Sequence, residues 1–255
     1  MRFDNAQHKF YCGIDLHART MDVCSLHHDG ERLVHRHMQA GPDPFLKTMA
    51  PSREDLVVCV ACLFTWYWLA DLCARDGMPF VLGHALSMQA IHGGKAKNDT
   101  IDAQKIAVLL RGGMLPQAYV YPAKMRATRD LLRRRIPLVR TRAARLTHIQ
   151  QTHRQYTLPE SGKKLAYKAN RDGVAARCAD PAVQTSIAVD LARIRSDDHL
   201  LHDVELTSVN TAKHHAPHTF YRLQSVPGIG TIVSLVMLSA IHDIARFPRV
   251  QDVVS

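Results

Sequence analysis

The chain has 255 residues, 33 Lys and Arg against 23 Asp and Glu, and a formal net charge of +10. A chain of this length can bury one large core or two modest ones, and its basic balance favours a polyanionic partner, most commonly nucleic acid. No apolar run approaches the roughly 20 residues that a membrane-spanning helix needs, and the N-terminal MRFDNAQHKF has no apolar signal core. Composition therefore predicts a cytoplasmic globular protein and excludes a membrane-spanning one.

The N-terminal segment predicts three strands. A short apolar run lies at 10–16, strand-like runs lie at 21–26 and 31–37, and Asp29-Gly30 between the second and third run is a strong hairpin signal. These runs therefore predict an antiparallel meander at the start of the domain.

The next segment predicts a βαβ unit. It has a buried strand from Leu56 to Val60, a helix over 62–77 that ends at Gly77, and a further strand over 78–84. Three meandering strands followed by such a unit is the element order of the ribonuclease H-like fold. Many unrelated α+β domains share that order, so the site residues must decide.

The charge of the chain is concentrated between 122 and 154, where ten Arg or Lys residues accompany the single acid Asp130. Apolar residues recur there in steps of four and three, which predicts a helix with one packed seam. A second seam follows, and the two helices could pair antiparallel as a coiled-coil arm. Pro137 would kink or break the first helix. The first seam is Leu132, Ile136, Val139, Ala143 and Leu146, and the second is Ile187, Leu191, Ile194 and Leu201.

A glycine-rich turn opens the last apolar helix. The sequence Ser225-Val-Pro-Gly-Ile-Gly230 is typical of the hairpin in a helix-hairpin-helix unit, in which Gly228 and Gly230 would let backbone N–H groups approach a phosphate. A plain turn between two helices is the alternative.

Three acidic residues could form a metal site. Asp15 ends the first strand, and Asp99 and Asp102 are one helical turn apart, so they project from the same face. Mg²⁺ takes oxygen ligands, and two such ions about 4 Å apart can stabilise phosphodiester cleavage. Alternatively, Asp99 and Asp102 are first-turn acids that the helix dipole favours.

Basic residues are the candidates for nucleic-acid contact. The alternative for the arm is a solvated helix face, but ten cations beside one acid would repel each other, which favours an anionic partner. The candidates are Lys95, Lys97, Arg133, Arg134, Arg135, Arg140, Arg142 and Arg145.

Two other patterns carry little weight. Cys59 and Cys62 have the spacing of a redox or zinc pair but lack a second pair, and the sixteen histidines are scattered. The six cysteines lie mostly in apolar segments, where reduced thiols behave as small hydrophobes, so no disulfide framework is expected.

Five sequence blocks together resemble a known family. YCGIDLHART, FTWYWLADLC, GGKAKNDTIDAQKIAVLLRGGMLPQAYVYP, LLRRR and VPGIGTIVSLVMLSAIHDIARFP are similar to the DEDD transposases of insertion sequence family one hundred and ten. The second and third blocks are specific, whereas VPGIG occurs in many DNA-binding proteins. The resemblance implies a RuvC-like mixed sheet with flanking helices over 1–121, a basic helical coiled-coil arm over 122–216, and a partial helix-hairpin-helix-containing domain over 217–255.

The resemblance also implies a metal-binding tetrad of Asp, Glu, Asp and Asp. Asp15 matches the first position, and Asp99 and Asp102 match the last two, but Ala61 stands where the Glu is expected. Alanine cannot bind a metal, so the Mg²⁺ site should be weakened. The family's nucleophilic serine lies in a later segment without an equivalent here, so we expect a C-terminally truncated and catalytically impaired copy.

The leading hypothesis is therefore a transposase or recombinase that cleaves and joins DNA strands. The family resemblance implies DNA and a structured guide RNA as partners, a homo-oligomer, either dimer or tetramer, and action at the bacterial nucleoid. Two alternatives stay open: a non-catalytic nucleic-acid-binding remnant, and a RuvC-like structure-specific nuclease, which would need the full tetrad.

Overall fold

The computed structural model describes residues 3, 6–61, 64–91, 99–158, 162–249 and 251–254. The side chains of 89, 99, 100, 162, 163 and 254 are not among the described parts. The chain forms two compact units, 1–123 and 124–255, and each is described by itself. The division of the second unit at 216 and 217 stays a prediction.

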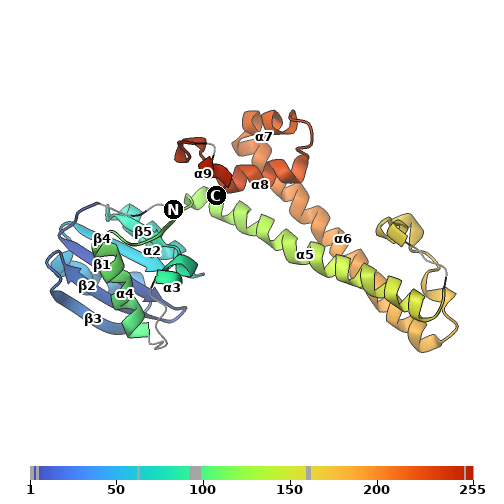
Figure 1. The fold of residues 1–255 in the computed structure, drawn as a ribbon, viewed down its shortest axis with the longest axis horizontal. Coiled ribbons are helices and arrows are strands. Elements are labelled where there is room, and N and C mark those ends of the chain that lie inside the picture. Colours follow the sequence, from blue (N-terminus) through green and yellow to red (C-terminus); the bar gives the residue numbers. More distant parts are fainter. Residues whose placement is uncertain are drawn as a thin grey trace. The chain divides into compact units, whose positions relative to one another are not determined.

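The first unit is built on a mixed six-stranded sheet, ordered β3-β2-β1-β4-β5-β6 (Figure 1). β1 pairs antiparallel with β2 and parallel with β4, while β2–β3 and β5–β6 are antiparallel and β4–β5 is parallel. This mixed sheet with its flanking helices fits an α/β ribonuclease H-like fold, as predicted. The strands are β1 (Phe10–Leu16), β2 (Thr20–His27), β3 (Arg32–Gln39), β4 (Leu56–Ala61), β5 (Phe80–Gly83) and β6 (Gln117–Ala118).

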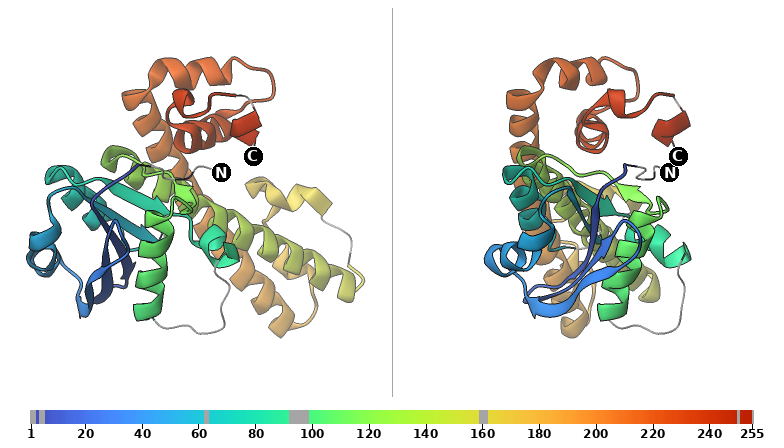
Figure 2. Two further views of the ribbon diagram at one scale, coloured as in Figure 1. Left: turned by 60° about the vertical axis from the view of Figure 1, so that its left-hand side comes forward. Right: turned by 90° about the vertical axis from the view of Figure 1, so that its left-hand side faces the viewer.

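Helices cover both faces of this sheet (Figure 2). On one face, α1 (Pro42–Met49) and α2 (Tyr67–Arg75) pack Phe45 and Leu69 against alternate strand residues such as Ile14. On the other face, α4 (Asp99–Arg111) packs against Tyr11 and Cys59. β1 and β4 are buried on both faces, which explains their nearly continuous apolar sequences.

The predicted hairpin is confirmed, and Gly30 shows why the turn sequence matters. Gly30 has φ +101°, a left-handed conformation that glycine adopts without steric cost, and its N–H donates to the His27 carbonyl. The predicted helix over 62–77 begins later than expected. It starts at Tyr67 because Thr65 Oγ1 donates to the Leu16 carbonyl and holds the preceding segment at the end of β1.

Among the described residues of the first unit, four elements were not predicted: α1, α3 (Ala85–Ile91), β6 and the 3₁₀ turn Ala50–Ser52. Pro at the start of α1 was an available signal, since proline is favoured in the first turn of a helix. β6 has two residues and depends on pairing with β5, which no local pattern reveals.

Gly13 allows α4 to cross β1 at close range. A Cβ placed at Gly13 would lie 2.3 Å from Ala107 N and 2.4 Å from the Ala103 carbonyl oxygen, so no other residue fits without moving the helix. The end of α4 lies near the start of β1, because Arg111 Nη1 donates to the carbonyl of His28, whose own N–H donates to Lys9. α4 therefore runs antiparallel to β1.

The second unit contains two long antiparallel helices, α5 (Ala123–Gln155) and α6 (Pro181–His215) (Figure 1). The ion pairs show that the two helices are antiparallel. Arg135 pairs with Glu205, whereas Arg145, which lies later on α5, pairs with Asp197, which lies earlier on α6. α5 continues through Pro137, so the predicted break does not occur. Short 3₁₀ turns connect the two helices at 162–166, 168–170 and 175–177.

The predicted apolar seam of α5 is wrong at three positions. Ile136 is 49% exposed, Val139 is 36% exposed and Ala143 is also exposed, whereas Leu132 is buried. The middle of the helix pair is joined by Arg–carboxylate pairs, and apolar clusters occur only toward the two ends. The seam predicted for α6 is confirmed at three positions, where Ile187, Leu191 and Ile194 are buried. A coiled coil therefore does not follow from heptad spacing alone.

Two shorter helices complete this unit. α7 (Pro217–Gln224) and α8 (Thr231–Ile241) are joined by the glycine-rich turn, and Phe220 and Leu235 pack with Leu132 and Ala212 of the long pair. A 3₁₀ turn (Ile244–Arg246) and α9 (Gln251–Val254) follow. Within the described ranges, no helix combines the length and apolar character required to cross a bilayer.

Candidate active site

Four strands of the first unit bring one residue each to a common level of the sheet. Asp15 lies directly opposite Asp22 in the β1–β2 register, and Ala61 lies opposite Gly83 in the β4–β5 register. Ile14 is level with Val60 in the parallel β1–β4 pair, so the next residues, Asp15 and Ala61, are also level. Residues level with each other on paired strands point to the same face of the sheet. This row consists of Asp22, Asp15, Ala61 and Gly83.

The row lies on the face that α4 covers. Tyr11 and Gly13, which alternate with Asp15 along β1, both contact α4. From Gly13, β1 advances about 7 Å to Asp15, while from Ala103 the antiparallel α4 retreats about 6 Å to its first residue, Asp99. The first turn of α4 therefore lies beside the end of β1 that carries Asp15.

The three predicted acids, Asp15, Asp99 and Asp102, differ in their surroundings and in whether their side chains are described. Asp15 is 9% exposed, and its Oδ2 lies 3.5 Å from His17 Nε2. Asp102 is more open, and its Oδ1 accepts from Lys105 Nζ at 3.0 Å. Asp99 is the first residue of α4, and its side chain lies outside the described part of the chain.

Asp22 is a further candidate residue of this site, which the sequence motifs did not indicate. It is 1% exposed, and its Oδ2 lies 2.8 Å from Nδ1 of His37, its direct partner on β3. Asp22 alternates with the buried Cys24 and Leu26 along β2, so it occupies an inward position of a predicted strand. A carboxylate at such a position was the available signal, while its place opposite Asp15 follows only from the β1–β2 register.

The donor atoms of this row and of the first turn of α4 suit a hard divalent cation, but they offer few ligands. Asp15, Asp22 and Asp102 present carboxylate oxygens, which Mg²⁺ prefers, and Ala61 presents none. Within the part of the chain that the structure describes, no group of three or more His, Cys, Asp or Glu side chains could hold a metal ion. The described residues therefore fit the cation by type and fall short in number.

Three of the arm arginines face carboxylates of α6. Arg135 Nε lies 2.6 Å from Glu205 Oε1, and Arg142 Nε lies 2.6 Å from Asp198 Oδ1. Arg145 pairs with Asp197 in the same way. Asp130 is the single acid between 122 and 154, whereas these three acids come from the partner helix α6.

Asp198 accepts from a second arginine as well, Arg171, which is 4% exposed. Burial would raise the pKa of Asp198, but hydrogen bonds from Arg171 and Arg142 outweigh burial and lower that pKa below its ordinary value. The arginine pair thus holds a carboxylate that is charged at neutral pH and ties α6 to α5 and to the connecting segment.

The other three candidate arginines of the arm face solvent. Arg133, Arg134 and Arg140 are exposed, and the described residues offer them no carboxylate. Arg133 and Arg140 are seven residues apart, two helical turns, and so share one face of α5. Lys95 and Lys97 lie outside the described residues.

The glycine-rich turn is open to solvent. Gly228 has φ +88°, and a Cβ at Gly228 or Gly230 would meet no atom within 4 Å. The space would admit a phosphate to the backbone, and contact with nucleic acid stays a prediction.

The described thiols behave as packing groups. Burial raises the pKa of Cys24 to about 11 and that of Cys73 to about 12, so both are protonated at neutral pH. Cys59 is buried, and Cys62, the other half of the predicted pair, lies outside the described residues.

Comparison with known proteins identifies the lineage. The DEDD transposase model of the IS110 type matches residues 12–157, more than half of the chain, and the transposase model of the IS116/IS110/IS902 family matches residues 221–255. No match is found among curated proteins. The first match spans Asp15, Asp99 and Asp102, and the second spans the glycine-rich turn. The chain therefore belongs to the IS110 family of DEDD transposases.

Proposed function

We propose that this chain is a DNA recombinase whose acidic row and α4 form a metal-dependent site for cleaving and joining DNA strands. Asp15, Asp99 and Asp102 would hold Mg²⁺, which, when bound, stabilises the attacking and leaving oxygens of a phosphodiester. The observation that carries the proposal is the antiparallel crossing of α4 over β1 at Gly13, which brings the first turn of α4 beside Asp15.

The protein's own residues would position these ligands. Asp15 is nearly buried at the end of a strand that is paired on both sides, so its carboxylate has little freedom to move. Thr65 holds the next residue of the chain through the Leu16 carbonyl. A ligand held in this way loses little conformational entropy when a metal binds, which favours binding.

Ala61 supports a second candidate function, a nucleic-acid-binding protein with little or no catalytic activity. It occupies the level beside Asp15 where the family resemblance places a Glu, and its methyl group offers no ligand. We propose that the recombinase site of this copy is impaired for this reason, while DNA and a structured guide RNA are still bound by the exposed face of α5 at the bacterial nucleoid. A homo-oligomer, dimer or tetramer, is part of the same proposal.

Isothermal titration of Mn²⁺ into the wild-type chain and Ala61→Glu tests the metal site. The restored carboxylate should raise the metal affinity at least about tenfold, since even outer-shell partners of metal ligands change affinity by 10–100-fold. Ala50→Glu, at an exposed position on the other side of the sheet, is the matched control and should bind as the wild type does.

The same variants distinguish the two candidates in an assay of strand cleavage and joining with element-end DNA and the element RNA. Because the family's nucleophilic serine is expected in a later segment, each variant is assayed as a fusion to the serine domain of an intact family member, and activity that appears only in the Ala61→Glu fusion supports an impaired recombinase. Equal metal affinity in Ala61→Glu and Ala50→Glu would reject the metal site. Nucleic-acid binding without any metal dependence would leave the binding protein as the function.

A further inference from the structure

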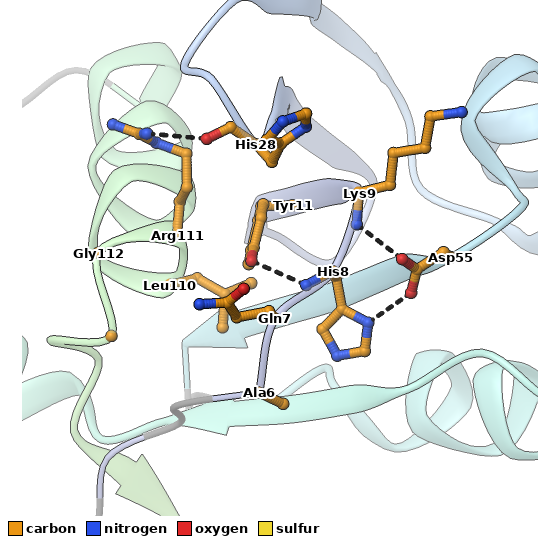
Figure 3. A pocket seen from close by; sticks show the side chains of 11 residues that line it. Ala6, Gln7, His8, Lys9, Tyr11, His28, Asp55, Leu110, Arg111 and Gly112 are labelled. Carbon is orange, nitrogen blue, oxygen red and sulfur yellow. Dashed lines mark hydrogen bonds and ion pairs between the residues drawn. The ribbon is translucent and has the colours of Figure 1, made fainter.

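A cavity of about 700 Å³ opens where β1 begins, at the other end of the strand from Asp15 (Figure 3). Lys9, one of its lining residues, is six residues from Asp15, or about 20 Å along an extended chain. The cavity therefore lies away from the acidic row, and its volume is within the roughly 300–1,000 Å³ of ordinary ligand sites.

Four segments of the first unit build its walls, and hydrogen bonds join them. Arg111, at the end of α4, donates from Nη1 to the carbonyl of His28 in the β2–β3 turn at 3.2 Å. The His8 backbone N–H donates to the Tyr11 hydroxyl at 2.8 Å, which fixes the approach to β1. The fourth segment is the loop before β4, which carries Asp55.

Among the described residues that line the cavity, Asp55 is the one acid, and its carboxylate is bonded to another part of the cavity wall. Its Oδ1 lies 2.7 Å from His8 Nδ1, and its Oδ2 accepts from the Lys9 backbone N–H at 2.8 Å. These interactions, the His8 hydrogen bond first, lower its pKa. Its backbone has φ +62°, a conformation that costs energy in a residue other than glycine and that this anchoring helps to maintain.

Two permanent cations border the same cavity. The Lys9 ammonium lies 5.4 Å from the centre of the Phe10 ring, and the Arg111 guanidinium is exposed. Among the described residues, no carboxylate pairs with either group. Figure 3 shows the Lys9 and Arg111 side chains on either side of His28. The lining is therefore basic, with hydrogen-bond donors from three separate segments.

We infer that this cavity binds the phosphodiester backbone of a nucleic-acid strand, an inference that rests on the proposed nucleic-acid function. Two phosphates of the strand would be bound, one at Arg111, because a guanidinium can donate two parallel hydrogen bonds to phosphate oxygens, and one at Lys9, whose ammonium is a compact charge. The cavity would thereby hold a strand on the nuclease-like unit without contact to the acidic row.

Fluorescence anisotropy with labelled single-stranded RNA, single-stranded DNA and duplex DNA, each at several salt concentrations, tests this inference. The double variant Lys9→Gln with Arg111→Gln should weaken binding by about tenfold or more. It should also lower the slope of log affinity against log salt by about 1.4 for a single strand, because each lost phosphate contact removes about 0.7. The probe that loses affinity identifies the strand that the cavity holds.

Lys47→Gln on α1 removes one exposed cation from the opposite side of the sheet and is the matched control. Lys9→Gln alone leaves the Arg111–His28 hydrogen bond in place, so it separates loss of a phosphate contact from loss of structure. If the Lys9 variants bind every probe as Lys47→Gln does, the inference is overturned while the proposed function stands. If the wild-type chain binds none of the probes, both fail.

Discussion

Asp15 and Asp22 face each other across β1 and β2 in direct register, and both carboxylates are nearly buried. Two carboxylates on directly opposite residues of paired strands repel each other unless a partner compensates one of the charges. His37 lies next in the row, with Nδ1 2.8 Å from the Asp22 carboxylate. The hydrogen bond from His37 therefore supports the arrangement in which Asp15 faces the first turn of α4.

His37→Leu should lower the free energy of unfolding of the first unit by about 1–2 kcal/mol, because the Asp22 carboxylate loses a hydrogen-bond donor. The expected loss is moderate because His37 is largely exposed, so solvent already weakens this interaction. Urea unfolding provides the measurement. The effect should shrink in an Asp22→Asn background, as a double-mutant cycle would reveal. His35→Leu on the same strand is the control, and equal stability of the two single variants would contradict the role given to His37.

Gly13→Ala should destabilise the first unit by about 3 kcal/mol, because the added methyl would lie 2.3 Å from the Ala107 backbone nitrogen, which cannot rotate away. α4 would have to shift, and the affinity for Mn²⁺ should fall with it. Gly41→Ala adds a methyl that meets only Pro44 at 3.7 Å, an ordinary contact, and should change stability by less than about 1 kcal/mol. Similar unfolding midpoints for the two variants would disprove the close crossing.

The stability of the second unit should fall in acid through Asp198. Its folded-state pKa is lowered, so its contribution is fully present above the unfolded value of about 3.9 and is lost as the pH falls through the lower folded value. Asp198→Asn should therefore be less stable than wild type at pH 6 and closer to it at pH 3. Urea unfolding followed by circular dichroism at 222 nm measures this difference.

Asp203→Asn is the control for that experiment, because Asp203 is 54% exposed and lies 3.8 Å from His199. Its difference from wild type should be small at both pH values. A constant stability difference between Asp198→Asn and wild type from pH 6 to pH 3 would show that Asp198 does not titrate as described.

The arm arginines should separate into two functional classes. Arg133→Gln with Arg140→Gln should weaken nucleic-acid binding and reduce its salt dependence, with a slope change of about 0.7–0.9 for each lost phosphate contact, while stability stays unchanged. Arg142→Gln should instead destabilise the helix pair, because Asp198 loses one of its two arginine partners. Anisotropy titrations and thermal unfolding of both variants compare these effects. The distinction fails if Arg142→Gln loses as much affinity as the double variant and keeps its stability.

The sequence alone predicted much of the first unit because the signals are local. Alternating and continuous apolar runs predicted the first five strands, and Asp29-Gly30 predicted the hairpin. The two long helices were predicted from apolar residues that recur in steps of four and three along each segment. The family assignment also came from residues adjacent in the chain, in blocks that the family models match.

Tertiary structure decided which residues meet. The position of Asp22 beside Asp15 follows only from the β1–β2 register. The position of Ala61 beside Asp15 follows only from the β1–β4 pairing. The charge pattern of α5 predicted that six arginines contact one anionic partner, but three of them form ion pairs with acids of α6. Charge is visible in one segment, whereas the distance between opposite charges depends on how segments far apart in the chain pack together.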